Sequence, residues 1–330
     1  MTNQQTTMQN SSTLSYSAKS HIDSSEFQWI GPDEKAMEAI ARPTINFWKD
    51  AMGRLFKSKV AILCFVILAV LIVGAIFIPI FSPFDFSRQN VAFANQPPMW
   101  VDNVTHQVHL FGTDDLGRDT WVRIWMGARV SLTVAIAVTL IDCLVGTIYG
   151  GISGYLGGGV DNVMMRIIEV VGGVPYLIVV MLLMVVLPRG LTTIIIAYSL
   201  TGWTGMARLV RGQVLGLRSE EFIVAAESMG SRPSRVIAKH LAPNLLGIIV
   251  VNVTLDIPNV IFTEAFLSML GLGIAPPQAS WGTLCNDGIL VFQMYPMQLV
   301  YPAVFISVTM LAFNLLGDQL RDALDPKLRR

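Results

Sequence analysis

The stretch from residue 60 to residue 81 contains no charged side chain, and no other feature of the chain restricts its fold as strongly. A helix of this length, rising 1.5 Å per residue, crosses about 30 Å of hydrocarbon. Because lipid offers no hydrogen-bond partners, a segment inside it must satisfy its backbone groups internally, as a helix does. The sequence therefore predicts a transmembrane helix here.

Five weaker apolar stretches follow this one. The chain is 53% hydrophobic and only 14% charged, whereas an average soluble protein carries about 25% charged residues. We therefore predict an all-α membrane protein with six transmembrane helices. The later spans are expected at about residues 130–149, 167–186, 191–207, 245–270 and 299–316.

The distribution of basic residues predicts the orientation of these spans. Of the 23 lysines and arginines, 18 fall on one set of alternate connecting segments and five on the other. The positive-inside rule puts the richer set in the cytoplasm, which makes both termini cytoplasmic. The equal number of acidic residues, also 23, argues against a nucleic-acid partner.

Composition also divides the chain. Residues 1–25 are rich in Gln, Ser, Thr and Asn without an apolar period, which predicts a disordered cytosolic tail and no cleaved signal peptide. Residues 26–59 are expected to form an amphipathic cytosolic segment at the membrane surface. Residues 60–330 form the predicted membrane domain, with an outer loop at 82–129 and a cytosolic loop at 208–244.

The polar interval 219–244 in the cytosolic loop predicts two short helices. Ser219 is a suitable N-cap for the first, with Glu220 and Glu221 near the positive end of the helix dipole. Gly230 suits the position just after the helix. The apolar residues between them recur at helical spacing: Phe222, Ala225, Ala226 and Met229.

The second helix is expected to begin around Ser231 and Pro233 and to stop before Pro243. It carries the basic residues Arg232, Arg235, Lys239 and His240. The small residues of the first helix let another backbone approach closely. Two interpretations are open: this stripe docks another protein, or it rests on the cytosolic helix ends of its own chain.

Several chemistries lack their sequence patterns. No G-x-x-x-x-G-K-[ST] phosphate loop, no G-x-S-x-G elbow and no H-E-x-x-H or Cys/His zinc pattern occurs. The three cysteines have no C-x-x-C spacing and are expected to act as small hydrophobic residues. We therefore expect no catalytic residues, no metal site and no bound cofactor on this chain.

The outer loop contains a group of three aspartates, Asp114, Asp115 and Asp119. An EF-hand calcium loop would need oxygen ligands at alternate positions and a distal glutamate, which are missing. A structural role is the better interpretation. Neighbouring glycines permit turns, and Arg118 is expected to pair with Asp115 or Asp119.

Three acidic residues, Asp142, Asp256 and Glu264, fall within predicted spans. Each acidic side chain costs about 2.5–3.5 kcal/mol at a helix centre on insertion scales, so such residues are candidates for a translocation path. The alternative is hydrogen bonding between helices, or a position near a helix end.

The fifth span carries most of these polar groups. Asn252, Asp256 and Asn259 lie on one stretch of it, and Pro258 is expected to bend it. A bent helix with amide and carboxylate groups could line a path for peptide backbone. These three polar residues are the predicted translocation-path residues.

The cytosolic loop resembles a known motif. Ala225-Ala226, then Gly230, His240 and Pro243 at the same spacing, are similar to the EAA loop in membrane subunits of ATP-binding cassette importers. The resemblance implies that this loop is a coupling element that docks in a cleft of a partner ATPase.

Two positions depart from the motif. Val224 occupies the position of its glutamate, and its closing I-x-L-P is represented by residues 240–243, H-L-A-P. The spacing is intact. The residues that the resemblance assigns to coupling are Glu220, Glu221, Phe222, Ala225, Ala226, Glu227, Met229, Gly230, Ser231, Pro233 and Arg235.

The outer loop narrows the resemblance. Residues 112–119 have the pattern G-T-D-x-x-G-R-D, followed by G-A-R-x-S-L, which resembles the signature of dipeptide, oligopeptide and nickel permeases. G-Y-L-G-G at 154–158, D-N-V-M-M-R at 161–166 and S-W-G at 280–282 extend it, and the long N-terminal segment is like that of C-type subunits. The signature residues are Gly112, Thr113, Asp114, Gly117, Arg118 and Asp119.

The resemblance implies a type I importer permease fold in a bacterial inner membrane. It also implies a second, B-type permease subunit, two ATPase subunits that carry ATP and Mg, and an extracytoplasmic peptide-binding protein. Oligopeptides or dipeptides are the expected substrates, with nickel or another small solute as the alternative in the same family. A stand-alone channel or secondary transporter is the alternative from a different class.

Overall fold

The computed structural model describes residues 47–102, 106–188 and 190–325. Nearly all of them belong to one compact unit, Trp48–Arg330. The predicted tail 1–25 lies outside the described residues, and so does most of the predicted amphipathic segment 26–59. The described end of that segment is helix α2, Phe47–Leu55, whose buried Leu55 packs with Ala61 and Ala323.

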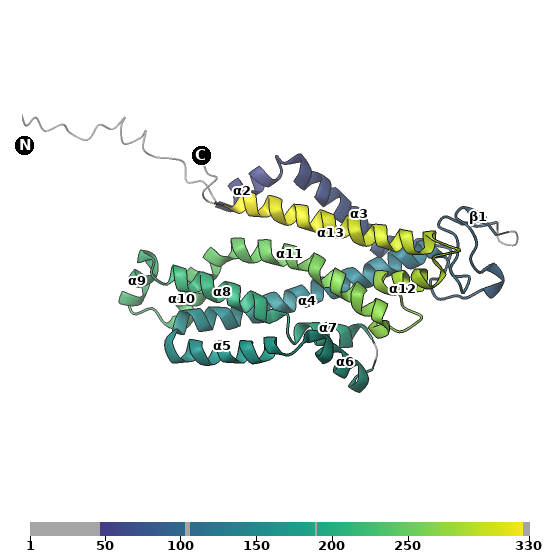
Figure 1. Ribbon diagram of the computed structural model, residues 1–330. Coiled ribbons are helices and arrows are strands. Elements are labelled where there is room, and N and C mark those ends of the chain that lie inside the picture. Colours follow the sequence, from purple (N-terminus) through teal and green to yellow (C-terminus); the bar gives the residue numbers. More distant parts are fainter. Residues whose placement is uncertain (1–46, 103–105, 189, 326–330) are drawn as a thin grey trace, which may run out of the picture. The chain divides into compact units, whose positions relative to one another are not determined.

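The first half of the structure contains two long helices, α3 and α4, and several shorter elements (Figure 1). The outer segment between the first two long helices holds a 3-10 turn and a two-stranded antiparallel sheet. In chain order the elements are α3 (Lys59–Phe81), η2 (Val91–Phe93), β1 (Trp100–Val101), β2 (Val108–His109), α4 (Thr120–Leu156), α5 (Gly158–Gly173), α6 (Tyr176–Val186) and α7 (Leu191–Ser199).

The second half is helical throughout its described elements. A π-helical segment joins α10 to α11 without a break in the helix, and a second one follows α11. The elements are α8 (Trp203–Leu217), α9 (Glu221–Ser228), α10 (Pro233–Val236), η3 (Ile237–Leu241), α11 (Ala242–Leu267), η4 (Ser268–Leu272), α12 (Trp281–Val291) and α13 (Met297–Leu324).

Four described helices are long and apolar enough to cross a membrane: α3, α4, the continuous helix Pro233–Leu272, and α13. The pair α5 and α6, bent by 73°, brings the number of spans to five. The predicted span at residues 191–207 falls on α7 and α8. The chain turns between these two helices, at Leu200–Gly202, and neither passes the same test alone.

Helix α3 confirms the strongest sequence prediction. Ser58 caps it, accepting a hydrogen bond from the backbone N–H of Ala61 at 3.3 Å. The Ser58 hydroxyl also donates to Gln319 Oε1 at 2.5 Å, which joins the start of α3 to the end of α13. One face of α3 is buried and the remaining apolar side chains are exposed, as expected for a helix that faces lipid.

Helix α4 is the central element, with buried residues along its whole length. Its contact with α8 is a seam of small residues. A Cβ added to Gly146 would lie 2.8 Å from the Trp203 carbonyl oxygen, and one added to Gly154 would lie 2.9 Å from the Arg211 carbonyl oxygen. Gly150, midway between them, approaches the α8 backbone in the same way. Such spacing of glycines lets membrane helices pack backbone to backbone.

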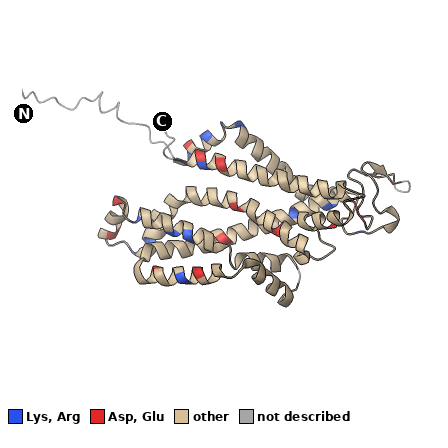
Figure 2. Ribbon diagram, in the orientation of Figure 1, with Lys and Arg blue, Asp and Glu red and all other residues tan. Residues whose placement is uncertain are grey.

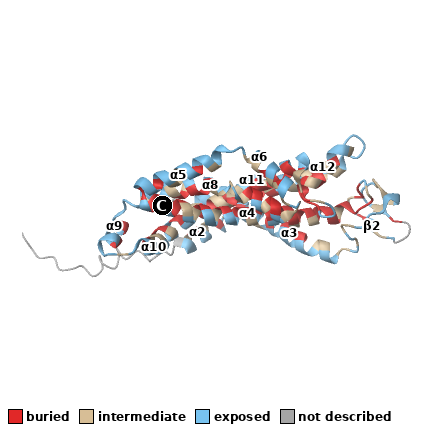
Figure 3. Ribbon diagram, turned by 90° about the horizontal axis from the view of Figure 1, so that it is seen from below, coloured by how far each residue is buried: buried red, intermediate tan, exposed pale blue. Residues whose placement is uncertain are grey.

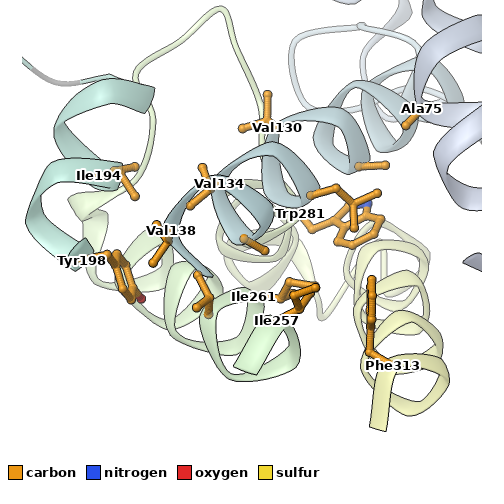
Figure 4. Packing of buried hydrophobic residues seen from close by; sticks show 14 of the residues in the cluster. Ala75, Val130, Val134, Val138, Ile194, Tyr198, Ile257, Ile261, Trp281 and Phe313 are labelled. Carbon is orange, nitrogen blue, oxygen red and sulfur yellow. The ribbon is translucent and has the colours of Figure 1, made fainter. Parts of the chain in front are cut away.

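The apolar core surrounds the outer half of α4 (Figure 4). Val130, Val134 and Val138 of α4 pack with side chains from α7, α11, α12 and α13. Trp281 of α12 is fully buried, and its indole N–H donates to the carbonyl oxygen of Ile124 at 3.1 Å. This packing fixes the outer ends of the helices around α4.

The two ends of the helix bundle differ in content (Figure 1). One end carries α2, α9, α10 and the end of α13. The other carries the two-stranded sheet and α12. Between them, the long middle of α3 shows neither acidic nor basic residues (Figure 2). The predicted outer loop and the predicted cytosolic loop therefore lie at opposite ends of the spans.

Candidate functional site

Helix α9 forms the first part of the predicted coupling loop. Its start differs from the prediction: Glu220, not Ser219, occupies the N-cap position, and its side chain makes no capping bond. Ser219 instead donates its hydroxyl to the carbonyl oxygen of Gly216 at 3.0 Å. Ser219 thus satisfies a carbonyl group at the end of α8, and the N-cap of α9 falls on the next residue.

The predicted apolar stripe is divided between two environments. Ala226 is buried, together with Ile223, which packs in a cluster with residues of α4, α8, α10 and α11. Phe222, Ala225 and Met229 are exposed, and Met229 keeps 79% of its surface accessible. One side of the stripe therefore rests on the chain's own helices, as the second interpretation predicts, and the other side is exposed (Figure 3). The docking role stays a prediction.

The turn after α9 has the geometry that the sequence predicts. Gly230 adopts φ +77°, its N–H donates to the Glu227 carbonyl oxygen at 2.8 Å, and the Ser231 N–H donates to the Ala226 carbonyl oxygen at 3.1 Å. This pair of bonds is the Schellman motif, which requires a left-handed residue after the helix. The glycine is explained by its backbone, since nothing described lies within 4 Å of an added Cβ.

The second predicted helix does not stop before Pro243. Pro233 occupies the first turn of α10, as expected, but Arg232 and not Ser231 is its N-cap. The chain then continues through η3 directly into α11. Pro243 has no N–H to donate, and the wider π-helical turn just before it absorbs this loss without a break.

The exposed side of this helix pair carries charge of both signs. Glu220, Glu221 and Glu227 are exposed on or beside α9. The exposed basic residues of the second helix are Arg232, Arg235 and Lys239. An open apolar face with charged neighbours is the composition of a protein-binding surface, with a polar rim around an apolar centre.

The outer loop is held by a buried ion cluster around Asp114. Its carboxylate accepts hydrogen bonds from Arg118 Nε at 2.7 Å and from Arg123 Nη1 at 2.8 Å, and from two backbone N–H groups. The side chains of Arg118 and Arg123 are only 6% and 3% exposed. Buried charges are stable only when paired in this way.

The predicted partners of Arg118 were partly wrong. Arg118 lies 3.7 Å from Asp115 but makes its short contact with Asp114, and Asp119 has a different partner. Asp119 Oδ2 lies 2.7 Å from His109 Nδ1, and its Oδ1 accepts the N–H of Val122, which caps α4. The sequence did not indicate His109, which stacks between Phe84 and the ring of Trp100.

The other signature residues shape the same loop. Gly112 and Gly117 have φ values of +74° and +70°. A Cβ on Gly117 would lie 2.7 Å from the backbone of Asn90. Thr113 donates its hydroxyl to the carbonyl oxygen of Phe93 and accepts the N–H of Gln96 at 2.8 Å. The signature therefore holds the outer loop on the start of α4, in agreement with the predicted structural role.

Asp287 of α12 borders this cluster. Its Oδ2 lies 3.5 Å from Arg123 Nη2, and its side chain is 41% exposed. Burial raises the pKa of Asp287 to about 6, and the negative charge of Asp115 adds to the rise, while Arg118 opposes it. Among the described residues, the end of the bundle that carries α12 thus contains a carboxyl group with a raised pKa.

The half of the bundle toward α9 has its own ion pair. Arg211 of α8 donates to both oxygens of Asp161 of α5 at 2.5 Å, and Ser153 of α4 donates to the same carboxylate at 2.6 Å. This contact joins three helices. Asp161 begins one of the motifs of the resemblance, but its partner 50 positions later could not be read from spacing.

The three intramembrane acids have different environments. Glu264 is 1% exposed and accepts hydrogen bonds from Ser131 at 2.9 Å and Ser268 at 2.8 Å. It therefore joins α11 to α4, and the alternative of hydrogen bonding between helices is correct for this residue. Asp142 and Asp256 instead line one cavity, which has a volume of about 230 Å³.

The cavity brings together residues from four helices and a turn. Asn259 lines it, as predicted, but Asn252 does not: its amide donates to Ile248 of its own helix at 3.4 Å. The sequence missed Tyr176, Tyr198 and Thr201 because they lie on other elements, and it missed Thr263 of α11 as well. The residues that line the cavity are Asp142, Tyr176, Tyr198, Thr201, Gly202, Asp256, Asn259, Val260 and Thr263.

Two family models match this chain. Residues 146–330 match the family model described as binding-protein-dependent transport system inner membrane component, and residues 46–98 match the N-terminal transmembrane domain of oligopeptide transport permease C.

Two curated relatives span nearly the whole chain. The oligopeptide transport system permease protein OppC of Bacillus subtilis (strain 168) is 50% identical over 89% of this chain and 94% of its own length. The dipeptide transport system permease protein DppC of the same organism is 51% identical over 90% of this chain and 92% of its own length.

Among solved structures, the inward-facing MetNI methionine ABC transporter has a TM-score of 0.46 at 19% identity, covering 61% of this chain and 97% of that chain. This likeness is too weak to carry a conclusion. The family model and the two relatives show the family by themselves. The chain belongs to the family of inner membrane components of binding-protein-dependent transport systems.

Proposed function

We propose that this chain is the C-type membrane subunit of an ATP-driven importer of oligopeptides or dipeptides. Two relatives named for oligopeptide and dipeptide transport, each about half identical over most of the chain, support this substrate class. The chain itself performs no hydrolysis under this proposal. A B-type membrane subunit, two ATPase subunits carrying ATP and Mg, and an extracytoplasmic peptide-binding protein complete the transporter.

The observation that carries the proposal is the open face of α9. A short helix outside the spans keeps Phe222, Ala225 and Met229 exposed while Ile223 and Ala226 anchor it to the rest of the chain. An exposed apolar face on an anchored helix is suited to a partner protein. We assign the coupling role to this face and to the Gly230 turn that orients it.

The topology that fits this role has six spans and both termini in the cytoplasm. Under this proposal α7 and the first part of α8 together form the fourth span, interrupted at Gly202. The Ser58–Gln319 bond holds the start of α3 and the end of α13 side by side. Both lie at the end of the bundle that carries α9 (Figure 1), so a cytosolic α9 implies cytosolic termini.

The translocation path is proposed to include Asp256 and Asn259, which line the cavity between α4, α6, α7 and α11. Asn252 lies on the same helix, outside the cavity lining. Binding and hydrolysis of ATP on the partners would move α9, and the spans would expose the cavity to opposite sides in turn.

Substitution on α9 tests the proposal. Met229→Glu places a charge in the centre of the open face, and we expect it to abolish co-purification of the ATPase subunits and uptake of a labelled tripeptide. Val91→Glu is the matched control, because Val91 is also an exposed apolar residue, 69% accessible, but lies on the outer loop. Normal ATPase association and uptake by Met229→Glu would refute the coupling role. Transport of nickel but not of peptide by the wild-type complex would refute the substrate class.

A further inference from the structure

The membrane cavity contains two carboxylates from different spans. Asp142 of α4 and Asp256 of α11 both belong to its lining. Residues 114 positions apart in sequence are thus brought to one site.

These charges have no basic partner in the cavity. Its lining, all of it within the described residues, includes no lysine, arginine or histidine. Asp142 is only 8% exposed, and its Oδ1 has no hydrogen-bond partner among the described residues. An intramembrane carboxylate without a partner is costly and indicates a function that needs it.

A second polar group in the lining is also unpartnered. Tyr198 is 7% exposed and its hydroxyl finds no hydrogen-bond partner in the described chain. It lies at the border of the apolar core (Figure 4). The hydroxyl of Tyr176, in the same lining, is likewise without a partner in the described chain. Buried hydroxyl groups are ordinarily hydrogen-bonded, so three unsatisfied polar groups lining one cavity indicate a missing ligand.

The size and chemistry of the cavity restrict that ligand. A volume of about 230 Å³ has room for several water molecules at about 30 Å³ each, or for one end of a peptide, but not for a whole oligopeptide. Tyr176 and Tyr198 place their ring centroids 5.7 Å apart beside the carboxylates. Aromatic faces attract organic cations. No group of three or more His, Cys, Asp or Glu side chains that could hold a metal occurs in the described residues.

We propose that this cavity is a subsite for an alkylammonium group of the translocated peptide, bound between Asp142 and Asp256. The group is the amino terminus of the peptide or the side chain of a lysine. An ammonium supplies three hydrogen-bond donors and no acceptor, which complements two carboxylates and the oxygen of a tyrosine. The inference rests on the proposed function, because it requires a peptide in the membrane path.

Gly202 supports the assignment of Asp142. A Cβ at this position would meet the Asp142 carboxylate, with Cγ at 2.8 Å. The absence of a side chain therefore leaves room for the carboxylate at the turn between α7 and α8.

The test uses the assembled transporter in proteoliposomes, with trialanine and N-acetyl-Ala-Lys-Ala as substrates. We expect Asp142→Asn to raise the KM for trialanine uptake by about tenfold, the equivalent of about 1.4 kcal/mol. The affinity of trialanine for the binding protein and the co-purification of the ATPases should not change. Asp142→Glu should restore much of the uptake. Asp318→Asn, at an exposed position of α13 outside the cavity lining, is the matched control.

The two peptides distinguish the sources of the ammonium group. If Asp142→Asn raises the KM for trialanine alone, the site binds the amino terminus. If it also raises the KM for the acetylated peptide, the site binds the lysine side chain as well. If the Asp142→Asn complex fails to assemble, the same KM measurements are made on Asp256→Asn. Asp256 is only half-buried, so its substitution disturbs the packing less. A KM equal to that of Asp318→Asn for both peptides overturns the inference. Failure of the wild-type complex to accumulate trialanine would instead refute the proposed function.

Discussion

The seam between α4 and α8 can be tested with a single methyl group at Gly150. A Cβ at this position would lie 3.0 Å from both the Ala207 carbonyl carbon and the Arg211 nitrogen, and closer still to the Ala207 carbonyl oxygen. All three atoms belong to the α8 backbone, so no side chain can rotate away. Gly150→Ala therefore requires the two helices to separate.

The expected size of the effect follows from two opposing contributions. Replacing glycine by alanine inside a helix is favourable by about 1 kcal/mol from propensity alone. Overpacking a close contact costs about 1–3 kcal/mol. Gly151→Ala is the matched control, because its Cβ would meet only Ile237 Cγ2, at 4.0 Å. Both variants gain the propensity contribution, so their difference isolates the overpacking cost.

Thermal unfolding of the purified complex in detergent measures this difference. We expect Gly150→Ala to be less stable than Gly151→Ala by about 1–3 kcal/mol, where each kcal/mol shifts Tm by about 2–4 °C in domains of 150–250 residues. Peptide uptake should also be lower for Gly150→Ala than for Gly151→Ala. Equal Tm values for the two variants would show that the helices have room to spare, and the backbone contact would be wrong.

Three further predictions concern the loop ends. Gly230→Val should cost about 1–2 kcal/mol, because valine disfavours the left-handed backbone, and should reduce coupled ATPase activity. Gly159→Val is the control and should not reduce it, because Gly159 has no positive φ and nothing described lies within 4 Å of its added Cβ. Equal ATPase activities of the two variants would contradict the role of the turn. Asp114→Ala should cost about 3–5 kcal/mol, because it removes the closest carboxylate from two buried arginines. The exposed Asp115→Ala should cost less than about 1 kcal/mol; both are read from thermal unfolding. Asp287, whose pKa is raised to about 6, contributes stability below about pH 3.9 that is lost as pH rises through 6. Asp287→Asn should therefore stabilise the protein at pH 7.5 by about 1 kcal/mol or less, given solvent screening of this exposed group, and an unchanged pH profile of Tm would refute this assignment.

Local structure was predicted best from the sequence where a single physical cause determines it. The uncharged run at 60–81 became α3, Lys59–Phe81, because burial in lipid decides such a segment by itself. Gly230 became the left-handed residue after α9 because this geometry is local. The start of α4 at Thr120, ten residues before the predicted span, could not be predicted, since ion pairs with the outer loop support that first part.

The candidate site shows where sequence reasoning ends. Asp142 and Asp256 were both singled out for their cost in a membrane, but their convergence on one cavity depends on how α4 packs against α11. Tyr198 resembles any other aromatic in an apolar run. Its role follows only from the hydroxyl that has no partner among the described residues. Pro243 misled the prediction because its effect depends on the π-helical turn that precedes it.

The glycine seam has a mechanical consequence. Gly146, Gly150 and Gly154 place the backbone of α4 directly against that of α8. Such close backbone contacts leave little room for the two helices to shift against each other, so we expect α4 and α8 to move as one rigid unit. A displacement of α8 would then be carried by α4 to Asp142, in the lining of the cavity.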